Sequence, residues 1–505
     1  MTETSSYILP SRAMRRTIAA RIGQIKGTSV KARSARAVIA LGVGTVAGRG
    51  TRLAKNMILA KFLLAPDQFG IAAIVMSFSM AFEALIEVGV KQSVIQNRRG
   101  ADGEYLNAAW WLQVARGLLL FAIASFLAPW IGSFYDNAEL AGMLRVAFVA
   151  VVLGGLISPR AYVLEKEFKF GRAVFLRQGS AILGAFVTVG LAVVMRNVWA
   201  LVLGFVAEMA IQCVLSFILV PFLPRLAIDK ESLGELMKFA RRMLGLPVLT
   251  ALSFQAPILI LGKVVSENDL GLYHVAALLA YIPVDLYSRV IAPVLLPAFS
   301  EKQDDNRALC RGIIQATRWT TLFIIPMIAF MACAARELLL VVYKAEYVAM
   351  AMVFAVLCLQ ILVRGAALNL SGVYMATAQP HLQRRFAAVR AALILVFMYP
   401  AAVRFGPLGV AVVIVLGHFA LLSMQVFEAR RVIDLELSRY LRSYLPGVLA
   451  ALPIIGVFDL IRLLAIDSPL LVLAIGATVF VTAFVTSVLV LNRNKRLPVV
   501  EGPRV

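Results

Sequence analysis

Residues 58–75 read ILAKFLLAPDQFGIAAIV. They hold the end of one apolar run, an acidic turn around Asp67, and the start of a second run at Gly70. Lys61 lies at the rim, just before the turn. This pattern predicts a hairpin of two helices, with Lys61 near the end of the first apolar helix.

A second stretch, residues 260–277, reads ILGKVVSENDLGLYHVAA and lies about 200 residues further on. The two align with one gap, so that Lys263 corresponds to Lys61 and Gly271 to Gly70. The period covers about six apolar runs, and because six is even, both halves have the same orientation in a membrane. We predict two six-helix lobes in a parallel repeat, followed by two C-terminal helices. Chance similarity between two helix boundaries is the alternative.

The composition excludes a soluble protein. The chain has 505 residues, of which 61% are hydrophobic and 15% are charged. Soluble domains have about 45–50% apolar and about 25% charged residues, and disordered chains have fewer apolar residues still. A water-soluble fold of this size cannot bury so much apolar surface.

The apolar residues fall into approximately fourteen runs, each near the length of about 20 residues that a spanning helix needs. The connectors are too short for a separate soluble domain. We therefore expect an all-α integral membrane protein with about 14 transmembrane helices. The expected spans are approximately residues 36–60, 70–95, 108–131, 140–162, 174–195, 198–222, 243–262, 271–297, 312–335, 347–376, 387–404, 408–427, 444–463 and 470–491.

The net charge of +22 lies in short islands between the apolar runs. That distribution favours membrane topology over nucleic-acid binding, and no nucleic-acid partner is expected. Basic residues concentrate in alternate connectors, where Arg384, Arg385 and Arg390 form one island, and this places both termini in the cytoplasm. The expected parts are a basic N-terminal segment (1–35), an N-lobe (36–222), a C-lobe (223–427), two further helices (428–491) and a cytoplasmic tail (492–505).

No motif indicates a metal, a cofactor or catalysis. The four cysteines form no CxxC pair, and the three histidines are scattered. The glycines Gly42, Gly44, Gly48 and Gly50 lie inside the first span and do not match a phosphate-binding loop, so we interpret them as residues that permit a kink or hinge in the helix.

Charged residues inside the predicted spans are the candidate functional groups, because each costs about 2.5–3.5 kcal/mol at mid-depth. Several pairs share one helix face: Arg49 with Arg52, Glu83 with Glu87, and Asp285 with Arg289. Pairing within the protein, such as Arg52 with Glu83, is one interpretation. Arginines that bind an anion in a wet cavity are the other. The candidates for an anionic ligand are Arg49, Arg52, Arg116, Arg289 and Arg364, and those for coupling or charge pairing are Glu83, Glu87, Glu208 and Asp285.

Five stretches in order along the chain resemble one family: LAPDQFG (64–70), EKEFKF (165–170), NVWALV (197–202), LGLYHVA (270–276) and PAFS (297–300). The chain resembles the Wzx-type polysaccharide transporters, flippases of lipid-linked oligosaccharides in the multidrug/oligosaccharidyl-lipid/polysaccharide exporter superfamily.

The resemblance implies a V-shaped transporter with alternating access, a cationic central cavity and no enzymatic activity. Its substrate would be an undecaprenyl-diphosphate-linked oligosaccharide, moved from the cytoplasmic to the periplasmic leaflet of a bacterial inner membrane for exopolysaccharide, O-antigen or capsule biosynthesis. Ion gradients or the membrane potential would drive it. Expected partners are this substrate, membrane lipid, a polysaccharide polymerase and a chain-length regulator.

The resemblance also places diphosphate-binding arginines on the first, second and eighth helices. Here Arg49 or Arg52 and Arg289 match the first and eighth, whereas the second helix has Glu83 and Glu87, so Arg116 or Arg364 would substitute. A lipid II flippase and a drug/cation antiporter of the same superfamily are the alternatives. A glycan polymerase is disfavoured, because the outside loops are short.

Overall fold

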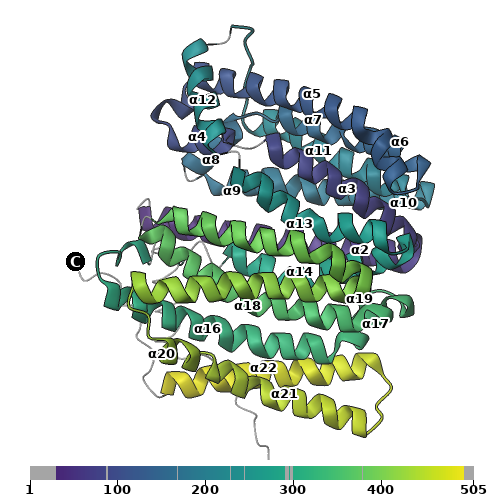
Figure 1. The fold of residues 1–505 in the computed structure, drawn as a ribbon, viewed down its shortest axis with the longest axis vertical. Coiled ribbons are helices and arrows are strands. Elements are labelled where there is room, and N and C mark those ends of the chain that lie inside the picture. The colour runs from purple at the N-terminus through teal and green to yellow at the C-terminus, as the bar shows by residue number, and fades with distance from the viewer. Residues whose placement is uncertain are drawn as a thin grey trace, which may run out of the picture.

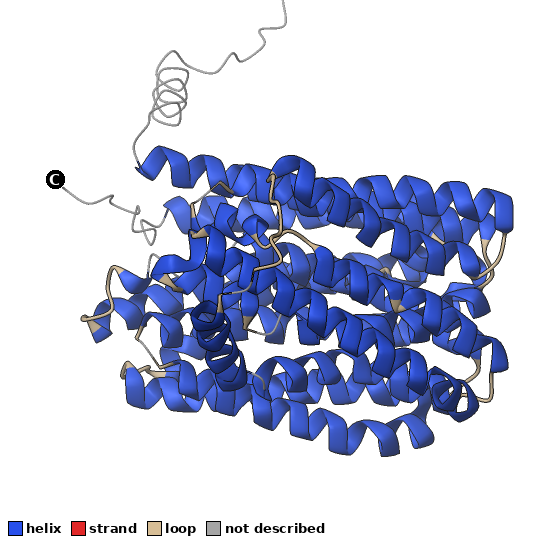
Figure 2. Ribbon diagram, turned by 90° about the horizontal axis from the view of Figure 1, so that it is seen from above, coloured by secondary structure: helices blue, strands red, loops and turns tan. Residues whose placement is uncertain are grey.

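The computed structural model describes residues 30–493, except 87–88, 168, 228, 244, 291–294, 296–298 and 378. Every regular element in these residues is helical, and Figure 2 shows long helices aligned with one another and joined by loops. The predicted all-α class is therefore confirmed. The basic N-terminal segment and the tail lie almost entirely outside the described residues.

The N-lobe is defined here as the elements from α2 to α11. They are α2 (Val30–Ile58), η1 (Leu59–Leu63), α3 (Pro66–Ile86), α4 (Val90–Gln96), η2 (Arg98–Ala101), α5 (Gly103–Phe134), α6 (Ala138–Ala147), α7 (Val149–Leu156), α8 (Arg160–Lys166), α9 (Phe170–Val174), η3 (Phe175–Gly179), α10 (Ser180–Met195) and α11 (Trp199–Leu219).

The connecting helix α12 (Lys230–Met243) precedes the C-lobe, and two helices follow it. The C-lobe comprises α13 (Gly245–Val264), α14 (Glu267–Val290), α16 (Asn306–Cys333), α17 (Ala335–Val342), η4 (Ala345–Met350), α18 (Ala351–Ala376) and α19 (Pro380–Val432). After the short α20 (Leu437–Arg442) come α21 (Leu445–Leu463) and α22 (Pro469–Arg493).

Ten helical runs of the described chain are long and apolar enough to cross a membrane. They account for eleven predicted spans, because the run His381–Val432 contains two of them. The other three predicted spans coincide with α2, α13 and α14, which line the cavity described below. The number of fourteen spans therefore stays a prediction, while the class of multi-pass membrane protein is confirmed.

The two spans predicted at 387–404 and 408–427 form one long element, α19, with a break at Gly406. Gly406 has φ 55° and ψ −141°, a conformation that a side chain would strain. Pro407 follows it and removes a backbone donor. The chain therefore turns at this position without a separate loop.

Figure 1 shows two helical bodies stacked along the long axis, with α21 and α22 on the far side of the C-lobe. α2 lies at the junction, where it packs on α10 of its own lobe and on α14 of the other. α3 and α14, which open on the two repeated stretches, pack directly on each other. This arrangement agrees with the division into two lobes and a C-terminal pair, whose boundaries stay a prediction.

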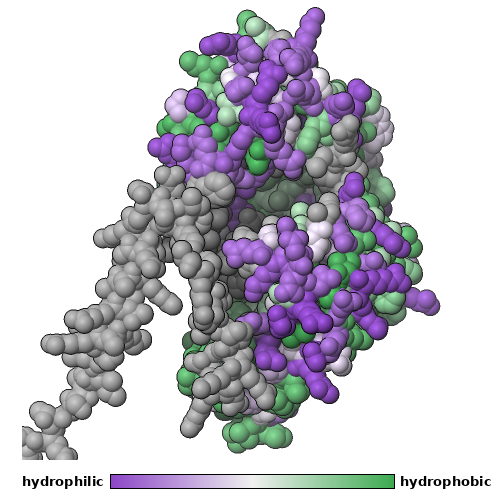
Figure 3. Space-filling model, turned by 90° about the vertical axis from the view of Figure 1, so that its left-hand side faces the viewer, coloured by the Kyte–Doolittle hydropathy of each residue, from purple (hydrophilic) through white to green (hydrophobic). Residues whose placement is uncertain are grey.

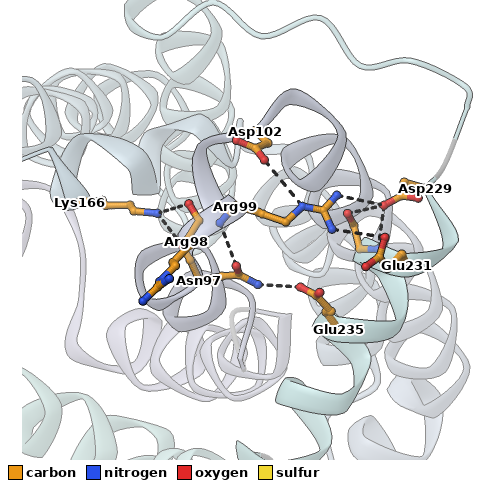
Figure 4. Close-up of polar contacts among 9 residues, drawn as sticks. Asn97, Arg98, Arg99, Asp102, Lys166, Asp229, Glu231 and Glu235 are labelled. Carbon is orange, nitrogen blue, oxygen red and sulfur yellow. Dashed lines mark hydrogen bonds and ion pairs between the residues drawn. The ribbon is translucent and has the colours of Figure 1, made fainter.

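The connecting helix α12 is docked on the N-lobe by a polar network (Figure 4). Arg99 lies between acidic groups, with Nη1 3.5 Å from Glu231 Oε2 and Nη2 3.9 Å from Asp229 Oδ2. Asn97 Nδ2 donates to Glu235 Oε2 at 2.8 Å. Gly89, at φ 80°, leaves room for Ala240 to approach the backbone. The linker between the lobes is therefore fixed to one of them.

Asp229 lies outside the spanning helices, in the turn before α12. Ser232 donates to Asp229 Oδ2 through its hydroxyl at 2.5 Å and its backbone N–H at 2.9 Å. These hydrogen bonds, with a smaller contribution from Arg99, lower the pKa of Asp229 below its usual range. The carboxylate therefore stays charged and caps the helix.

Figure 3 looks onto the end of the molecule that carries α4, α8, α12 and α20. Hydrophilic residues surround a hollow between the two lobes there. These connectors hold the basic islands that predict the cytoplasmic side.

Candidate functional site: a cavity between the lobes

A cavity of about 660 Å³ lies between the lobes. Its walls come from α2, α3 and α11 of the N-lobe and from α13 and α14 of the C-lobe. Much of the lining is apolar, and a polar strip crosses it. The charged and amide side chains of that strip are Arg49, Arg52, Lys55, Asn56, Glu83, Glu208, Gln212 and Gln255.

α2 supplies the basic part of the strip. Arg49, Arg52 and Lys55 follow one another at three-residue spacing, which puts them on one helix face. Gly48 and Gly44 lie one and two turns before Arg52 on an adjoining face, and their missing side chains let Gln178 and Val174 pack against the backbone. The interpretation that these glycines permit the helix to kink or hinge stays a prediction: α2 continues through them, and Gly44 and Gly48 serve close packing here.

Both arginines of this face form ion pairs with other helices. Arg49 Nη2 lies 2.6 Å from Asp285 Oδ2 on α14, and Arg52 Nη2 lies 2.7 Å from Glu208 Oε1 on α11. Arg49 therefore joins the two lobes, while Arg52 pairs within one lobe. The expected partner of Arg52 was Glu83, which lines the same cavity on α3. The spacing of charged residues along each helix therefore did not predict which carboxylate pairs with Arg52.

Lys55 is the third cation of the strip, and it has no ion pair within 4.0 Å among the described residues. Three basic and two acidic side chains of the described chain line the cavity, and Asp285, the partner of Arg49, is a third carboxylate. These described charges balance, so the cationic character of the site lies in the basic face of α2 and not in a net charge.

The remaining predicted site residues are distributed as follows. Arg116 of α5 is not part of the cavity wall. Arg364 of α18 lies behind the wall, with its guanidinium 5.2 Å from the centre of the Phe254 ring. Arg289 falls in the last turn of α14, and its side chain lies outside the described residues, as does Glu87.

One charged cluster was missed. Arg390, assigned from the sequence to a cytoplasmic connector, is instead inside α19 and only 9% exposed, because that helix begins ten residues earlier, at Pro380. It meets His418 and Gln360 in the interior of the C-lobe. The shared face of Gln360 and Arg364, four residues apart, was the available signal. In the described part of the chain, no group of three His, Cys, Asp or Glu side chains could hold a metal ion.

The cavity is closed at the end opposite the hollow, where the two repeated turns meet. Gly70 packs on the carbonyl oxygen of Glu267, and Gly271 packs on that of Pro66. Neither contact leaves space for a Cβ atom. The first turns of α3 and α14 therefore contact each other through their glycines, in two equivalent contacts related by a local twofold axis.

The two rim lysines of the repeat also reach across to the opposite lobe. Lys61 donates to the carbonyl oxygen of Val341 at 3.0 Å, and Lys263 pairs with Asp136 at 2.6 Å. Asn137 adds a hydrogen bond to Glu267 at 2.8 Å. The lobes are thus tied together at one end and separated by a hollow at the other, which is the geometry of one state of an alternating-access transporter (Figure 3).

Residues 58–352 match the sequence profile of a family described as polysaccharide biosynthesis protein. The chain belongs to this family. The family assignment agrees with the resemblance seen in the sequence, since the matched region begins at the first repeated stretch and includes the second.

Two curated bacterial proteins are similar to this chain over long alignments. The succinoglycan biosynthesis transport protein ExoT of Rhizobium meliloti is 24% identical over 59% of this chain and 60% of its own length. The lipopolysaccharide biosynthesis protein WzxC of Escherichia coli is 23% identical over 74% of this chain and 75% of its own length. The chain thus aligns with less than two thirds of ExoT.

Two solved structures share the fold. The lipid II flippase MurJ in an inward closed conformation superposes with a TM-score of 0.75 at 13% identity, covering 91% of this chain and all of MurJ. An inward-facing multidrug MATE transporter gives 0.59 at 14% identity, covering 83% and 98%. At such identities the likeness concerns the fold, and that fold is a membrane transporter fold.

Proposed function

We propose that this protein is a flippase for polyprenyl-diphosphate-linked oligosaccharides. It takes a repeat unit for exopolysaccharide, O-antigen or capsule from the cytoplasmic leaflet of a bacterial inner membrane to the opposite leaflet. The observation that carries the proposal is the basic face of α2, with Arg49 and Arg52, inside an inter-lobe cavity of this family.

The two arginines bind the diphosphate by exchanging partners. A guanidinium forms two parallel hydrogen bonds to a phosphate as readily as to a carboxylate. In the empty cavity, Asp285 and Glu208 hold Arg49 and Arg52 in place, so neither cation is left uncompensated. An arriving diphosphate takes over these bonds, and Lys55 adds the positive charge that has no carboxylate partner.

Releasing the Arg49–Asp285 pair also loosens a contact between the lobes, because its members lie on α2 and α14. Substrate binding is thereby linked to movement of one lobe against the other. The freed carboxylates, with Glu83 nearby, are the groups available to take up protons while the empty cavity resets. A diphosphate with two negative charges gains about 5 kcal/mol when it moves outward across about 100 mV, interior negative.

The orientation proposed follows from the basic connectors. In this proposal the hollow of Figure 3 opens on the cytoplasmic side, and the same charge rule assigns both termini to the cytoplasm. Delivery of substrate by glycosyltransferases inside the cell and removal by a polymerase and its chain-length regulator outside complete the pathway in this proposal.

Reconstitution in proteoliposomes tests the function. A fluorescent polyprenyl-diphosphate oligosaccharide is placed in both leaflets, and dithionite added outside quenches only the outer dye. Loss of the protected signal in vesicles with protein, and its persistence in empty vesicles, supports the proposal. Faster transfer of labelled lipid II would indicate a peptidoglycan precursor flippase, and ethidium exchange without lipid transfer would indicate an antiporter; both results contradict the proposal.

A further inference from the structure

The C-lobe contains a second polar site, separate from the main cavity. Arg390 and His418 come from the two halves of α19, and Gln360 comes from the neighbouring α18. Their side chains are 9%, 3% and 2% exposed, respectively. Three polar groups buried so deeply among apolar neighbours need hydrogen-bond partners.

The hydrogen bonds fix the state of the histidine. His418 Nδ1 lies 2.8 Å from the backbone carbonyl oxygen of Ile414, so this nitrogen carries the hydrogen. Nε2 is then an acceptor, and it faces Arg390 Nη1 at 3.3 Å and Gln360 Nε2 at 3.4 Å. The ring is neutral and cannot compensate the charge of Arg390.

The positive charge of Arg390 has no counter-charge in the part of the chain that the structure describes. Among the described residues, no carboxylate lies within ion-pair distance of Arg390, and its Nε has no hydrogen-bond partner. Its guanidinium lies 5.5 Å from the centre of the Phe254 ring, and Arg364 lies 5.2 Å from the same centre. A phenyl ring offsets only a fraction of the cost of a buried cation, and here two cations share one ring.

A pocket of about 20 Å³ lies at this cluster, lined by Gln360, Arg390, His418, Phe254 and Tyr281 among others. The space suffices for one particle the size of a water molecule. Phe254, Pro257 and Tyr281 also line the main cavity, so the pocket adjoins the route by which ions can enter.

We propose that this pocket binds a single monovalent anion of halide size, for which chloride is the abundant candidate. The anion neutralises Arg390, accepts from its Nε and from the Gln360 amide, and replaces the missing carboxylate. A water molecule of the same size satisfies donors but brings no charge. A diphosphate or a sugar carboxylate with its ring is too large for the space. The inference does not depend on the flippase function.

The test measures thermal unfolding of the detergent-purified protein at constant ionic strength. Sodium chloride or sodium bromide is compared with sodium gluconate, whose anion is too large for the pocket. The unfolding midpoint should rise with the logarithm of the chloride concentration above Kd, by about 2 °C at a tenfold excess over Kd. Bromide should act in the same way. Equal midpoints in chloride and gluconate would show that only water occupies the pocket, and would overturn the proposal.

Three variants locate the effect. Arg390→Gln removes the cation and should abolish the chloride shift. Gln360→Glu supplies an internal carboxylate, so it should raise the midpoint in gluconate and also abolish the chloride shift. If Arg390→Gln does not fold, this second variant tests whether the shift arises at Arg390. Arg52→Gln, in the main cavity, should keep the full shift. A shift that persists in Gln360→Glu, or that disappears in Arg52→Gln alone, contradicts the assignment to this pocket.

Discussion

The two lobes each hold an arginine between their helices, and they neutralise it differently. In the N-lobe, Arg52 of α2 forms a 2.7 Å ion pair with Glu208 of α11. In the C-lobe, Arg390 of α19 faces the neutral ring of His418 at 3.3 Å. The first arrangement is complete without a ligand, whereas the second requires charge from outside. At the Arg52 site an anionic ligand has to displace the carboxylate of Glu208. At the Arg390 site it has no carboxylate to displace.

The space around each arginine sharpens this contrast. Arg52 faces a cavity of about 660 Å³ and is 43% exposed, so a large headgroup can displace Glu208. Arg390 is buried and faces a pocket of about 20 Å³, which has room for a single small ion. In the two proposals, arginine binds a large anion in one lobe and a small anion in the other.

The largest expected effect is on transport through the N-lobe site. Arg52→Ala removes a charge-assisted hydrogen bond worth about 1.5–3 kcal/mol, so the rate of lipid transfer in proteoliposomes should fall about 10- to 100-fold. Arg52→Lys should also be impaired, because it keeps the charge but loses the planar fork.

The matched control is Arg462→Ala, since Arg462 is 65% exposed on α21, away from the cavity. It should transport at the normal rate. Wild-type transfer by Arg52→Ala, with comparable insertion, would remove Arg52 from the proposed substrate site and break the contrast between the lobes.

The second prediction concerns the contact that joins the lobes. Gly271→Val places a side chain against the carbonyl oxygen of Pro66, and such overpacking costs about 1–3 kcal/mol. The closed end should therefore open more often. Cysteines at Asp136 and Lys263, which pair at 2.6 Å, should form fewer crosslinks in this variant. Gly456→Val, which meets nothing within 4 Å, is the control, and equal crosslinking in both would contradict the prediction.

The third prediction removes the carboxylate beside the arginine of one lobe and adds a carboxylate beside the arginine of the other. Glu208→Gln leaves Arg52 with a neutral partner and should lower the unfolding midpoint in gluconate by about 2 °C, for an ion pair worth about 1 kcal/mol. Gln360→Glu gives Arg390 a charged partner and should raise the midpoint. Calorimetry on both variants measures the two shifts, and shifts of equal sign would show that the lobes do not differ in this respect.

The smallest expected effect is on the docking of α12. The pKa of Asp229 is lowered in the folded state by Ser232, so its contribution is present above about pH 4 and is lost as the pH falls through the folded pKa. Asp229→Asn should reduce hydrogen-exchange protection of α12 at pH 7 and match the native protein in strong acid. Asp304→Asn, at an exposed turn, should leave α12 unchanged at both pH values.

The sequence predicted the fold well because membrane helices are long and their boundaries are chemically abrupt. The two repeated turns were recognised from Lys61, Gly70 and their counterparts, and the structure brings those turns together. The α2 face was predicted because the three-residue spacing of Arg49 and Arg52 is a local property.

The rest depended on packing between distant segments. Glu208 and Asp285 were candidates from the sequence, but their pairing with α2 required distant helices to be placed first: α11 of the same lobe for Glu208 and α14 of the other lobe for Asp285. Arg390 was misassigned because a count of basic residues near span ends does not show where a helix begins. His418 looked isolated, since its partners lie 28 and 58 residues away.

The reciprocal contact of Gly70 and Gly271 has a consequence for the origin of the molecule. A twofold contact consists of two copies of one surface, so a half-length chain with a single such turn would make the same contact with its own duplicate. In a homodimer, that contact would weaken on dilution. Gene duplication and fusion would keep the two copies at a fixed effective concentration, and would leave each half free to change its charges.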